Sequence, residues 1–379
     1  MEFIVLNTKF ETIDIIDVFM SSIWTDRYDA YGDFELSLPM EPSLLDVLKE
    51  DYYLITEESE HVMIIEDLDV TTDIEEGERL LVTGRSLESI IDRRIIMNKT
   101  VFVPEYDADN NEILPNLQNG IEKLLNENVI NPAIAARRIP NFIFEESTDE
   151  LVTSLEFEAQ YWGDNLYDVV SSLCYEKQIG FKITLNDNNQ FVFKLYAGAD
   201  RSYEQFENPY VVFSPQNDNL FNSSYYKSKS NFKNVAYVLG EEIEDSIVDE
   251  DGDRERKSFT LGTELGLDRR EVFADANDLT SKIDEDTTLT ETQYRAHLKQ
   301  RGIDTLIEHM EVEAFEGEVE ATQMYKYGED FFMGDIVQIV DEYGNEGRVY
   351  ISEFILSQDK EGIAMYPTFV TLQEGVYYA

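Results

Sequence analysis

The sequence predicts a β-rich protein of the α+β class. Short runs of β-favouring residues fill most of the first hundred positions and the last seventy, whereas helical periodicity is confined to a few segments between them. A pattern of strands near the N-terminus also recurs near the C-terminus. With 379 residues, the chain is long enough for two to three domains of about 150 residues each.

Residues 1–98 are expected to form a first β domain. Its clearest strand is 33–39, because Phe34, Leu36 and Leu38 alternate with polar residues as far as Pro39. Further strand candidates are 3–6, 12–16, 52–58, 61–73 and 77–84. A short helix is expected at 41–50, and Ser86 is expected to cap another, with Glu88 in its first turn.

Residues 99–215 are expected to form a small α/β module. Segment 114–129 has a helical pattern, and segment 162–180 has a stronger one, with Gly180 in the position of a C-terminal cap. A hairpin follows, because apolar residues alternate on both sides of a polar turn. The apolar positions are Leu166, Val169, Val170, Leu173 and Cys174 in the helix and Phe181, Ile183, Leu185, Phe191, Phe193 and Leu195 in the hairpin.

Residues 216–311 are expected to bridge the domains, and residues 312–379 to form a second β domain. The bridging part combines strand candidates at 234–240 and 258–273, a solvated acidic loop at 241–256 and a helix at 290–310. Gly302 marks a possible break in that helix.

Two segments of the β domains echo each other. "DYYLITEESEHVMIIEDLDVTTDIEEG" begins at Asp51, and "DIVQIVDEYGNEGRVYISEFILSQDKEG" begins at Asp335. Both have the pattern of a strand, an acidic turn, a strand that ends in Glu, a further strand and a Gly. The shared residues are Glu66 and Gly77 in the first segment and Glu353 and Gly362 in the second. The echo predicts a structural duplication.

The charge of the chain limits its partners. The chain has 30 Lys and Arg residues and 79 Asp and Glu residues, which gives a net charge of -49. Binding to nucleic acid or to an anionic membrane needs a basic face, which no cluster supplies.

A single cysteine, Cys174, excludes a disulfide within the chain. The first residues lack the pattern of a signal peptide, and no apolar run approaches the roughly 20 residues of a membrane span, so we expect a soluble protein.

No pattern indicates catalysis, a metal or a cofactor. The three histidines, His61, His297 and His309, lack metal-ligand spacing and are expected to be ordinary surface or packing residues. The "DEDGD" run at Asp249–Asp253 lacks the ligand order of a calcium loop. Acid pairs such as Glu57/Glu58 and Glu75/Glu76 are expected by chance among 79 acids. The sequence has no phosphate-binding loop and no GxSxG or GxGxxG motif.

Paired arginines stand out in so acidic a chain. The pairs are Arg93/Arg94, Arg137/Arg138 and Arg269/Arg270. Local salt bridges are one interpretation. Ion pairs across subunit contacts, where Arg is favoured, are the other, with Arg93, Arg94, Arg269 and Arg270 as the candidates.

Four motifs occur in an order that resembles a known family. They are "SSIWTDRYDAYGDFELSLP" from Ser21, "LLVTGRSLESIIDRRI" from Leu80, "GLDRREVFADANDL" from Gly266 and "YKYGEDFFMGDIVQI" from Tyr325. Together they resemble the tail-tip or baseplate hub proteins of siphophages, which are tail-associated virion proteins. That family is similar in fold to the baseplate hub of contractile phages.

The resemblance implies an architecture and a function. It implies a ring-forming homotrimer with two tube-like β-barrels per chain (1–98 and 312–379) and lateral α/β modules. The ring would cap or extend the tail tube, let DNA pass, and contact distal tail, tail tube, tape measure and receptor-binding or fibre proteins. It would be made in the bacterial host cytoplasm and reside in the virion tail tip, with no catalytic residue, metal or cofactor. Because the chain stops at Ala379, without the C-terminal extension of some long relatives, we expect cell-wall cleavage to belong to other proteins.

The resemblance also assigns residues. The motif residues expected to be structural are Trp24, Tyr28, Tyr31, Gly32, Gly84, Arg85, Gly328, Gly334 and Asp335. If the ring encloses a channel, acids of the hairpin turns are expected to line it, with Glu57, Glu58, Asp341 and Glu342 as the candidates. Two alternatives stay open: a hub of a phage-derived contractile particle, and an acidic β-rich carbohydrate hydrolase.

Overall fold

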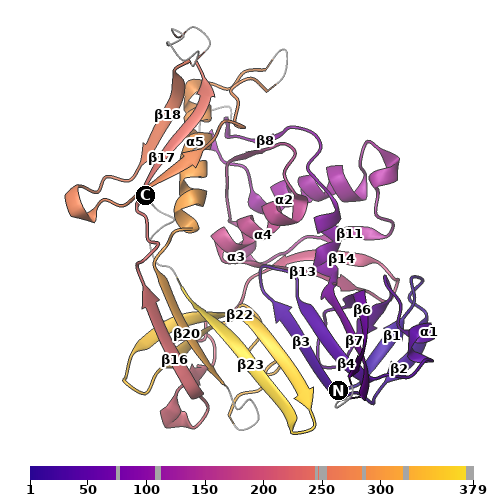
Figure 1. Ribbon diagram of the computed structural model, residues 1–379. Coiled ribbons are helices and arrows are strands. Elements are labelled where there is room, and N and C mark those ends of the chain that lie inside the picture. The colour runs from indigo at the N-terminus through magenta and orange to yellow at the C-terminus, as the bar shows by residue number, and fades with distance from the viewer. Residues whose placement is uncertain are drawn as a thin grey trace.

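The protein is described here from a computed structural model. The structure describes residues 1–73, 77–106, 112–243, 246, 254–283, 287–318 and 324–372. Glu75, Glu76 and the segment Asp249–Asp253 lie outside the described residues. Figure 1 shows two groups of long strands side by side, with helices and shorter strands beyond them. The expected β-rich α+β class is confirmed.

The N-terminal β lobe consists of residues 3–93. Its strands are β1 (Phe3–Leu6), β2 (Thr12–Ile16), β3 (Ser21–Arg27), β4 (Asp33–Pro39), β5 (Tyr53–Ile55), β6 (Met63–Asp73) and β7 (Gly77–Ser86), and its helices are α1 (Leu44–Val47) and the 3-10 helix η1 (Leu87–Arg93). The alternation in β4 buries Phe34, Leu36 and Leu38 as expected. Ser86 precedes η1, but its side chain does not cap it: the hydroxyl accepts a hydrogen bond from Gly32 N at 2.7 Å.

The α/β module follows. Its strands are β8 (Thr100–Phe102), β9 (Glu105–Tyr106), β10 (Glu112–Ile113), β11 (Phe142–Glu145), β12 (Ala159–Tyr161), β13 (Gly180–Leu185) and β14 (Phe191–Tyr196). Its helices are α2 (Leu117–Leu125), the π-helix η2 (Asn126–Ile130), η3 (Ala135–Arg137), α3 (Glu150–Thr153) and α4 (Leu166–Lys177). The predicted hairpin is confirmed, with Ile183 opposite Phe193. Gln178 is the left-handed residue that ends α4, at φ 54°, so the expectation that Gly180 caps it is wrong.

The C-terminal β lobe contains β15 (Val212–Phe213), η4 (Pro215–Asn217), β16 (Phe221–Ser228), β20 (Val312–Glu318), β21 (Ile336–Val340), β22 (Glu346–Asp359) and β23 (Gly362–Thr371). The predicted echo is visible in the pairing. β5–β6–β7 and β21–β22–β23 are both antiparallel, and the register shifts after Ile65 in the first and after Ile351 in the second.

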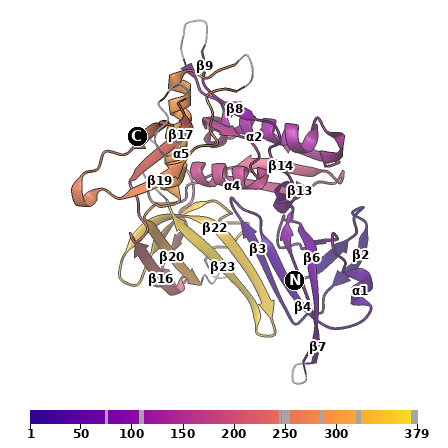
Figure 2. The ribbon, with the colours of Figure 1, turned by 45° about the horizontal axis from the view of Figure 1, so that its top comes forward.

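One sheet runs through both lobes. β22 pairs with β3, with Glu353 opposite Arg27 and Gln358 opposite Ser22. The described strands of the two lobes therefore form a 13-stranded sheet, whose main path ends at β2 and at β16. Figure 2 shows β3 and β22 next to each other at the junction of the lobes.

A further unit contains β17 (Val235–Glu242), β18 (Arg256–Leu261), η5 (Gly266–Asp268), β19 (Glu271–Asp275) and α5 (Glu291–Ile307). A capping box between Thr290 and Gln293 starts α5. The helix continues through Gly302, where the break was expected, because a Cβ there would lie only 3.0 Å from Val238 Cγ2 and Gly lets the helix pack closely on β17. No helix among the described residues is long and apolar enough to cross a membrane.

Candidate functional site

Tyr28 lies where three parts of the chain meet. It follows β3 and is 1% exposed. Its hydroxyl lies 3.3 Å from Gln178 O and 3.4 Å from Tyr196 O, both in the α/β module, and 3.2 Å from Gly198 N, which donates to it. Its ring packs against Tyr350 of β22 at a centroid distance of 5.8 Å. One side chain thus contacts both β lobes and the module.

Glycines make room for the Tyr28 ring. A Cβ on Gly334 would lie 2.2 Å from the ring, and a Cβ on Gly180 would lie 2.4 Å from it. Gly334 also has φ +83°, which favours glycine. Gly328 has nearly the same φ, +82°, but no atom lies within 4 Å of a Cβ built there. Gly180 and Gly334 are therefore required by packing, whereas Gly328 is required only by its turn.

Asp335 ties the C-terminal lobe to the chain after β14. It is 2% exposed, and its carboxylate accepts hydrogen bonds from Ala199 N at 2.7 Å, Arg201 Nε at 2.6 Å and Phe332 N at 3.0 Å. A buried carboxylate needs such partners to offset the loss of its hydration.

The remaining motif residues make their contacts within the N-terminal β lobe. Arg85 binds the Glu66 carboxylate through two nitrogens, at 2.8 and 2.9 Å, binds Asp92 at 3.0 Å, and stacks on Tyr31 at 4.9 Å. Backbone approaches closely at Gly84 and Gly32, where a Cβ would lie 1.8 Å from Ile64 O and 2.1 Å from Thr25 O. The Trp24 indole is buried and donates to Asp26 at 3.0 Å.

A buried charge network joins the N-terminal lobe to the module. His61, 5% exposed, has its Nδ1 3.1 Å from Glu88 Oε1 and interacts electrostatically with Asp26. The Glu88 carboxylate also accepts a hydrogen bond from Ile183 N of β13 at 2.7 Å. Burial by itself lowers the pKa of His61, but the charges of Asp26 and Glu88 outweigh it and raise this pKa to about 9. Nothing in the sequence indicates this network except Glu88, the acid in the first turn of η1.

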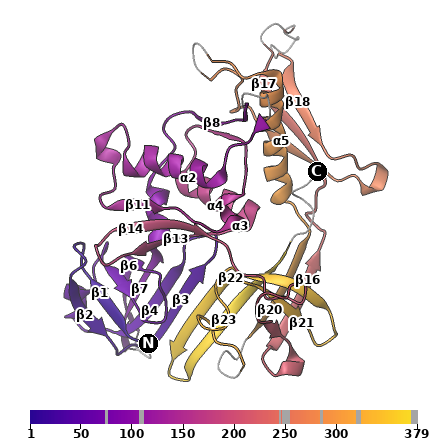
Figure 3. The ribbon, with the colours of Figure 1, turned by 180° about the vertical axis from the view of Figure 1, so that it is seen from behind.

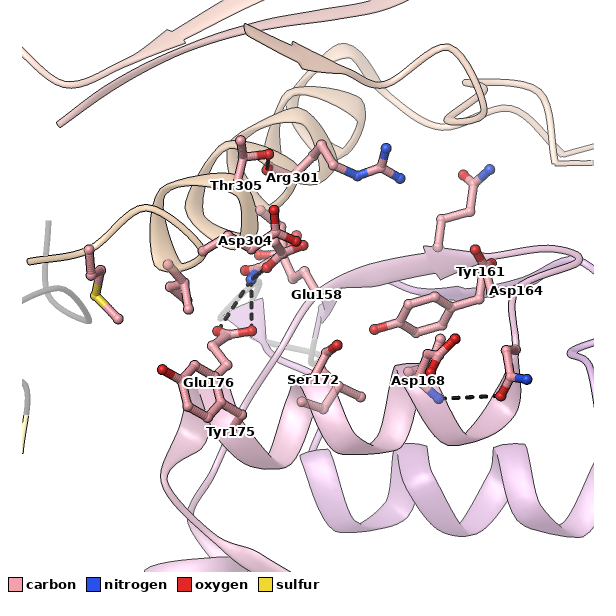
Figure 4. A pocket seen from close by; sticks show the side chains of 18 of the residues that line it. Glu158, Tyr161, Asp164, Asp168, Ser172, Tyr175, Glu176, Arg301, Asp304 and Thr305 are labelled. Atoms are coloured by element: carbon pink, nitrogen blue, oxygen red, sulfur yellow. Dashed lines mark hydrogen bonds between the residues drawn. The ribbon is translucent and has the colours of Figure 1, made fainter. Parts of the chain in front are cut away.

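A cavity of about 750 Å³ separates α4 from α5. Its acidic lining residues are Glu158, Asp164, Asp168, Glu176, Asp304, Glu308 and Glu311. In Figure 4, Glu176 and Asp304 face each other from the two helices, and Arg301 points away from them. Gln300 Nε2 donates to Asp304 at 2.8 Å and to both Glu176 oxygens at 3.2 and 3.3 Å. Asp304 is open to the cavity, yet the surrounding protein and the Glu176 charge raise its pKa to about 7.

This cavity has the charge to attract cations but not a metal-binding geometry. Among the described residues, no group of three or more His, Cys, Asp or Glu side chains could hold a metal ion. Arg301 is already bound to Asp278 through two nitrogens, at 3.0 and 2.6 Å.

The four candidate channel acids lie in two turns. Glu57 and Glu58 are exposed between β5 and β6, and Glu342 is exposed between β21 and β22. Asp341 differs from the expectation, since it is 3% exposed and its carboxylate accepts hydrogen bonds from Tyr343 N and Asn345 N, both at 2.8 Å. Asp341 shapes its own turn instead of presenting a charge to solvent.

The arginine pairs have different surroundings. Arg269 binds Glu271 at 2.5 Å, and Arg270 donates to Lys229 O at 2.7 Å. Arg93 lies 3.8 Å from Asp51, with both side chains exposed. Arg94 donates to two backbone oxygens, those of Arg93 and Arg137, at 2.8 and 2.9 Å. Arg137 donates to Ile95 O, and Arg138 is exposed.

A sequence model of a viral protein family covers nearly all of the chain. The family is described as siphovirus ReqiPepy6 Gp37-like protein, and it matches residues 2–369. The chain belongs to this family. The match confirms the resemblance to siphophage tail proteins that the four motifs indicated. No curated protein matches the sequence of this Gp37-like chain.

Solved structures of phage tail proteins share the fold of the Gp37-like chain. Prophage tail protein gp18 from Listeria monocytogenes EGD-e has 15% identity and a TM-score of 0.51 and covers 99% of this chain and 96% of its own. The 43 kDa tail protein of prophage MuSo2 from Shewanella oneidensis has 12% identity, a TM-score of 0.55 and 98% coverage of both chains. A tail protein from Neisseria meningitidis MC58 has 9% identity, a TM-score of 0.56 and coverages of 99% and 97%. At these identities, the comparison establishes a common fold.

Proposed function

We propose that this Gp37-like protein is the structural hub of a siphophage tail tip. Three copies form a ring that caps or extends the tail tube and connects it to distal tail, tape measure and fibre proteins. The likeness to phage tail proteins, which spans almost the full length of both chains in each comparison, is the observation that carries this proposal. The protein acts as a scaffold in the virion, and no catalytic step is assigned to it.

The repeated meander supports the proposed symmetry. Each chain has two lobes with the same strand order, joined in one sheet through β3 and β22. Three such chains present six similar lobes, which suits a tube with sixfold symmetry. An isolated dimer would present four similar lobes and a ring of six chains would present twelve, and neither number matches a tube with sixfold symmetry.

The first prediction is a threefold ring in the tail tip. Three-dimensional reconstruction of tails that carry a tagged copy of this chain is expected to show three tags per tip, directly beneath the tube. Six tags, or a stable dimer of the purified protein in light scattering, would contradict the proposal. A sheath around the tube of the same particles would assign the hub to a contractile particle instead.

The second prediction concerns the charge of the channel. We propose that Glu57, Glu58 and Glu342 face the lumen, where at about 0.15 M salt their field extends roughly 8 Å and repels DNA phosphates. Replacing all three by Lys is expected to slow DNA ejection, because lysines bind phosphates. Ejection is measured on assembled particles at several salt concentrations, and the slowing is expected to weaken as salt rises.

The Gln variant of the same three residues is the control for that experiment. It removes the repulsion without adding attraction, so its ejection is expected to be slower than that of the wild-type particle but faster than that of the Lys variant. Normal ejection by the Lys variant, in particles whose reconstruction places the three residues at the lumen, would mean that these acids serve solubility only.

A further inference from the structure

Two surface features carry side chains whose exposure or pairing the fold itself does not explain. The first is the connection between β18 and β19, residues 262–270, which we call the leucine loop. The Leu265 side chain is 79% exposed and Leu267 is 100% exposed. A leucine side chain stabilises a protein by about 1.5–3 kcal/mol when it is buried, so two leucines that are largely exposed on one loop indicate a contact with another surface.

The leucine loop is held in shape before any partner arrives. Arg269 donates to Glu264 O at 3.2 Å and binds Glu271, and Asn234 Nδ2 donates to Asp268 O at 2.8 Å. Arg269, which the sequence suggested as a subunit contact, thus supports the loop from within. The loop presents the two leucines with the acids Glu264 and Asp268 beside them. Its preorganisation lowers the entropy that binding would cost.

The second feature is an arginine pocket of about 370 Å³, lined by Asp92, Arg93, Arg94, Ile95, Ala136 and Arg137. Within the described part of the chain, no carboxylate pairs with Arg94 or Arg137, whose hydrogen bonds go to backbone oxygens. Asp92 is already bound by Arg85 and by Asn165. Burial and the neighbouring charges of Arg137 and Arg93 lower the pKa of Arg94.

The arginine pocket is suited to an acidic and apolar segment. Within the described residues, the guanidinium groups of Arg94 and Arg137 lack the carboxylate partners that Arg prefers, whereas Arg93 lies 3.8 Å from Asp51. Ile95, 50% exposed, belongs to the lining, and Ile134, 48% exposed, lies two residues before Ala136. In a chain of net charge -49, arginines left without acids of their own are a strong sign of an external anionic partner.

The loop and the pocket lie on opposite sides of the molecule. In Figure 1 the connection between β18 and β19 projects to the left, and the chain that follows α2 lies on the right of the upper half of the molecule. Figures 2 and 3 show the same separation from two other directions. The two features therefore cannot meet within one copy, but two different surfaces on opposite sides can join neighbouring copies head to tail.

We propose that the leucine loop of one copy binds in the arginine pocket of the next copy around the ring. Leu265 and Leu267 contact Ile95 and Ile134, and Glu264 and Asp268 pair with Arg94 and Arg137. This contact rests on the ring proposed above and gives it a defined lateral interface. It explains the exposed leucines and the unpaired guanidinium groups together.

Thiol cross-linking tests the contact in assembled tails. The sole native thiol, Cys174, is buried, so engineered cysteines can be joined selectively. Tails that carry L267C and A136C in the same chain are expected to give, with a short bis-maleimide, covalent products up to the size of the complete ring. Tails that carry either change alone are expected to give none. The pair L151C and A136C is the matched control, because Leu151 is 60% exposed but lies on α3.

The outcomes separate this inference from the proposed function. A threefold ring without cross-links between L267C and A136C would overturn the contact and leave the ring in place. Cross-links in tails that carry L267C alone would also overturn the contact between the loop and the pocket. Tails without a threefold ring would overturn the proposed function itself.

Charge reversal supplies a second test that does not depend on cysteine geometry. R94E with R137E is expected to lower the yield of assembled tails about tenfold or more, which corresponds to the loss of one strong charged contact. Adding E264R and D268R is expected to restore most of that yield. Full assembly of the first variant, or no restoration by the second pair, would show that the pocket does not receive the loop.

Discussion

Replacement of His61 by Ala is expected to destabilise the protein by about 3–5 kcal/mol, the usual cost when one partner of a buried ion pair is removed. The change would leave Asp26 and Glu88, both at most 5% exposed, without their shared cation. Urea unfolding followed by tryptophan fluorescence measures the loss. His309→Ala is the control, because His309 is only part-buried and bonds to Thr305 O. Equal effects of the two changes would contradict the network.

The same network predicts a pH dependence. The folded-state pKa of His61 is about 9, above its ordinary value of 6.5. A raised pKa means that the stabilisation is fully present below pH 6.5 and is lost as the pH rises through 9, in all about 3 kcal/mol. Unfolding free energies measured from pH 6 to pH 10 are therefore expected to fall more in the wild type than in His61→Gln. Parallel profiles would show that His61 does not carry the charge.

Gly334→Ala is expected to cost about 2–4 kcal/mol, because it adds an overpacked methyl group to an unfavourable backbone conformation. The methyl group would press on one part of the Tyr28 ring, and the ring cannot withdraw because Gly180 lies against it as well. Gly328→Ala is a close control, since its φ of +82° matches the +83° of Gly334 and nothing lies near its Cβ. Its expected cost is about 1 kcal/mol. Thermal unfolding of both variants measures the two losses of stability. Equal losses of stability would refute a role for the contact with the Tyr28 ring.

Local patterns predicted much of the fold. The alternation around residues 181–195 gave the hairpin β13–β14, and the apolar face of 166–177 gave α4, because both patterns record burial along a single element. The echo between the segments that start at Asp51 and Asp335 likewise predicted two matching meanders. The local pattern wrongly predicts that Gly180 caps a helix, because the actual role of Gly180 depends on the Tyr28 ring, which lies 152 positions earlier in the chain.

Contacts between distant segments could not be predicted from the sequence. His61, Asp26 and Glu88 are unremarkable in spacing, and the fold of the N-terminal lobe brings them together, while Ile183 N of the module donates a further hydrogen bond to Glu88. The polar turn around Asp341 predicts a surface acid, but Asp341 is buried and its carboxylate is bound within the turn by Asn345. The arginine pocket likewise joins residues more than 40 positions apart.

The pairing of β3 with β22 has a consequence for how the chain is made. Ser22 and Gln358, which face each other across this pair, are separated by more than 330 positions. During synthesis, β3 and β4 emerge early, but β3 keeps one unpaired edge until β22 has left the ribosome. Such an edge is open to pairing with other chains, and contacts this distant in sequence form slowly. Chaperones that shield nascent chains are therefore expected to determine the yield of this protein more than its final stability does.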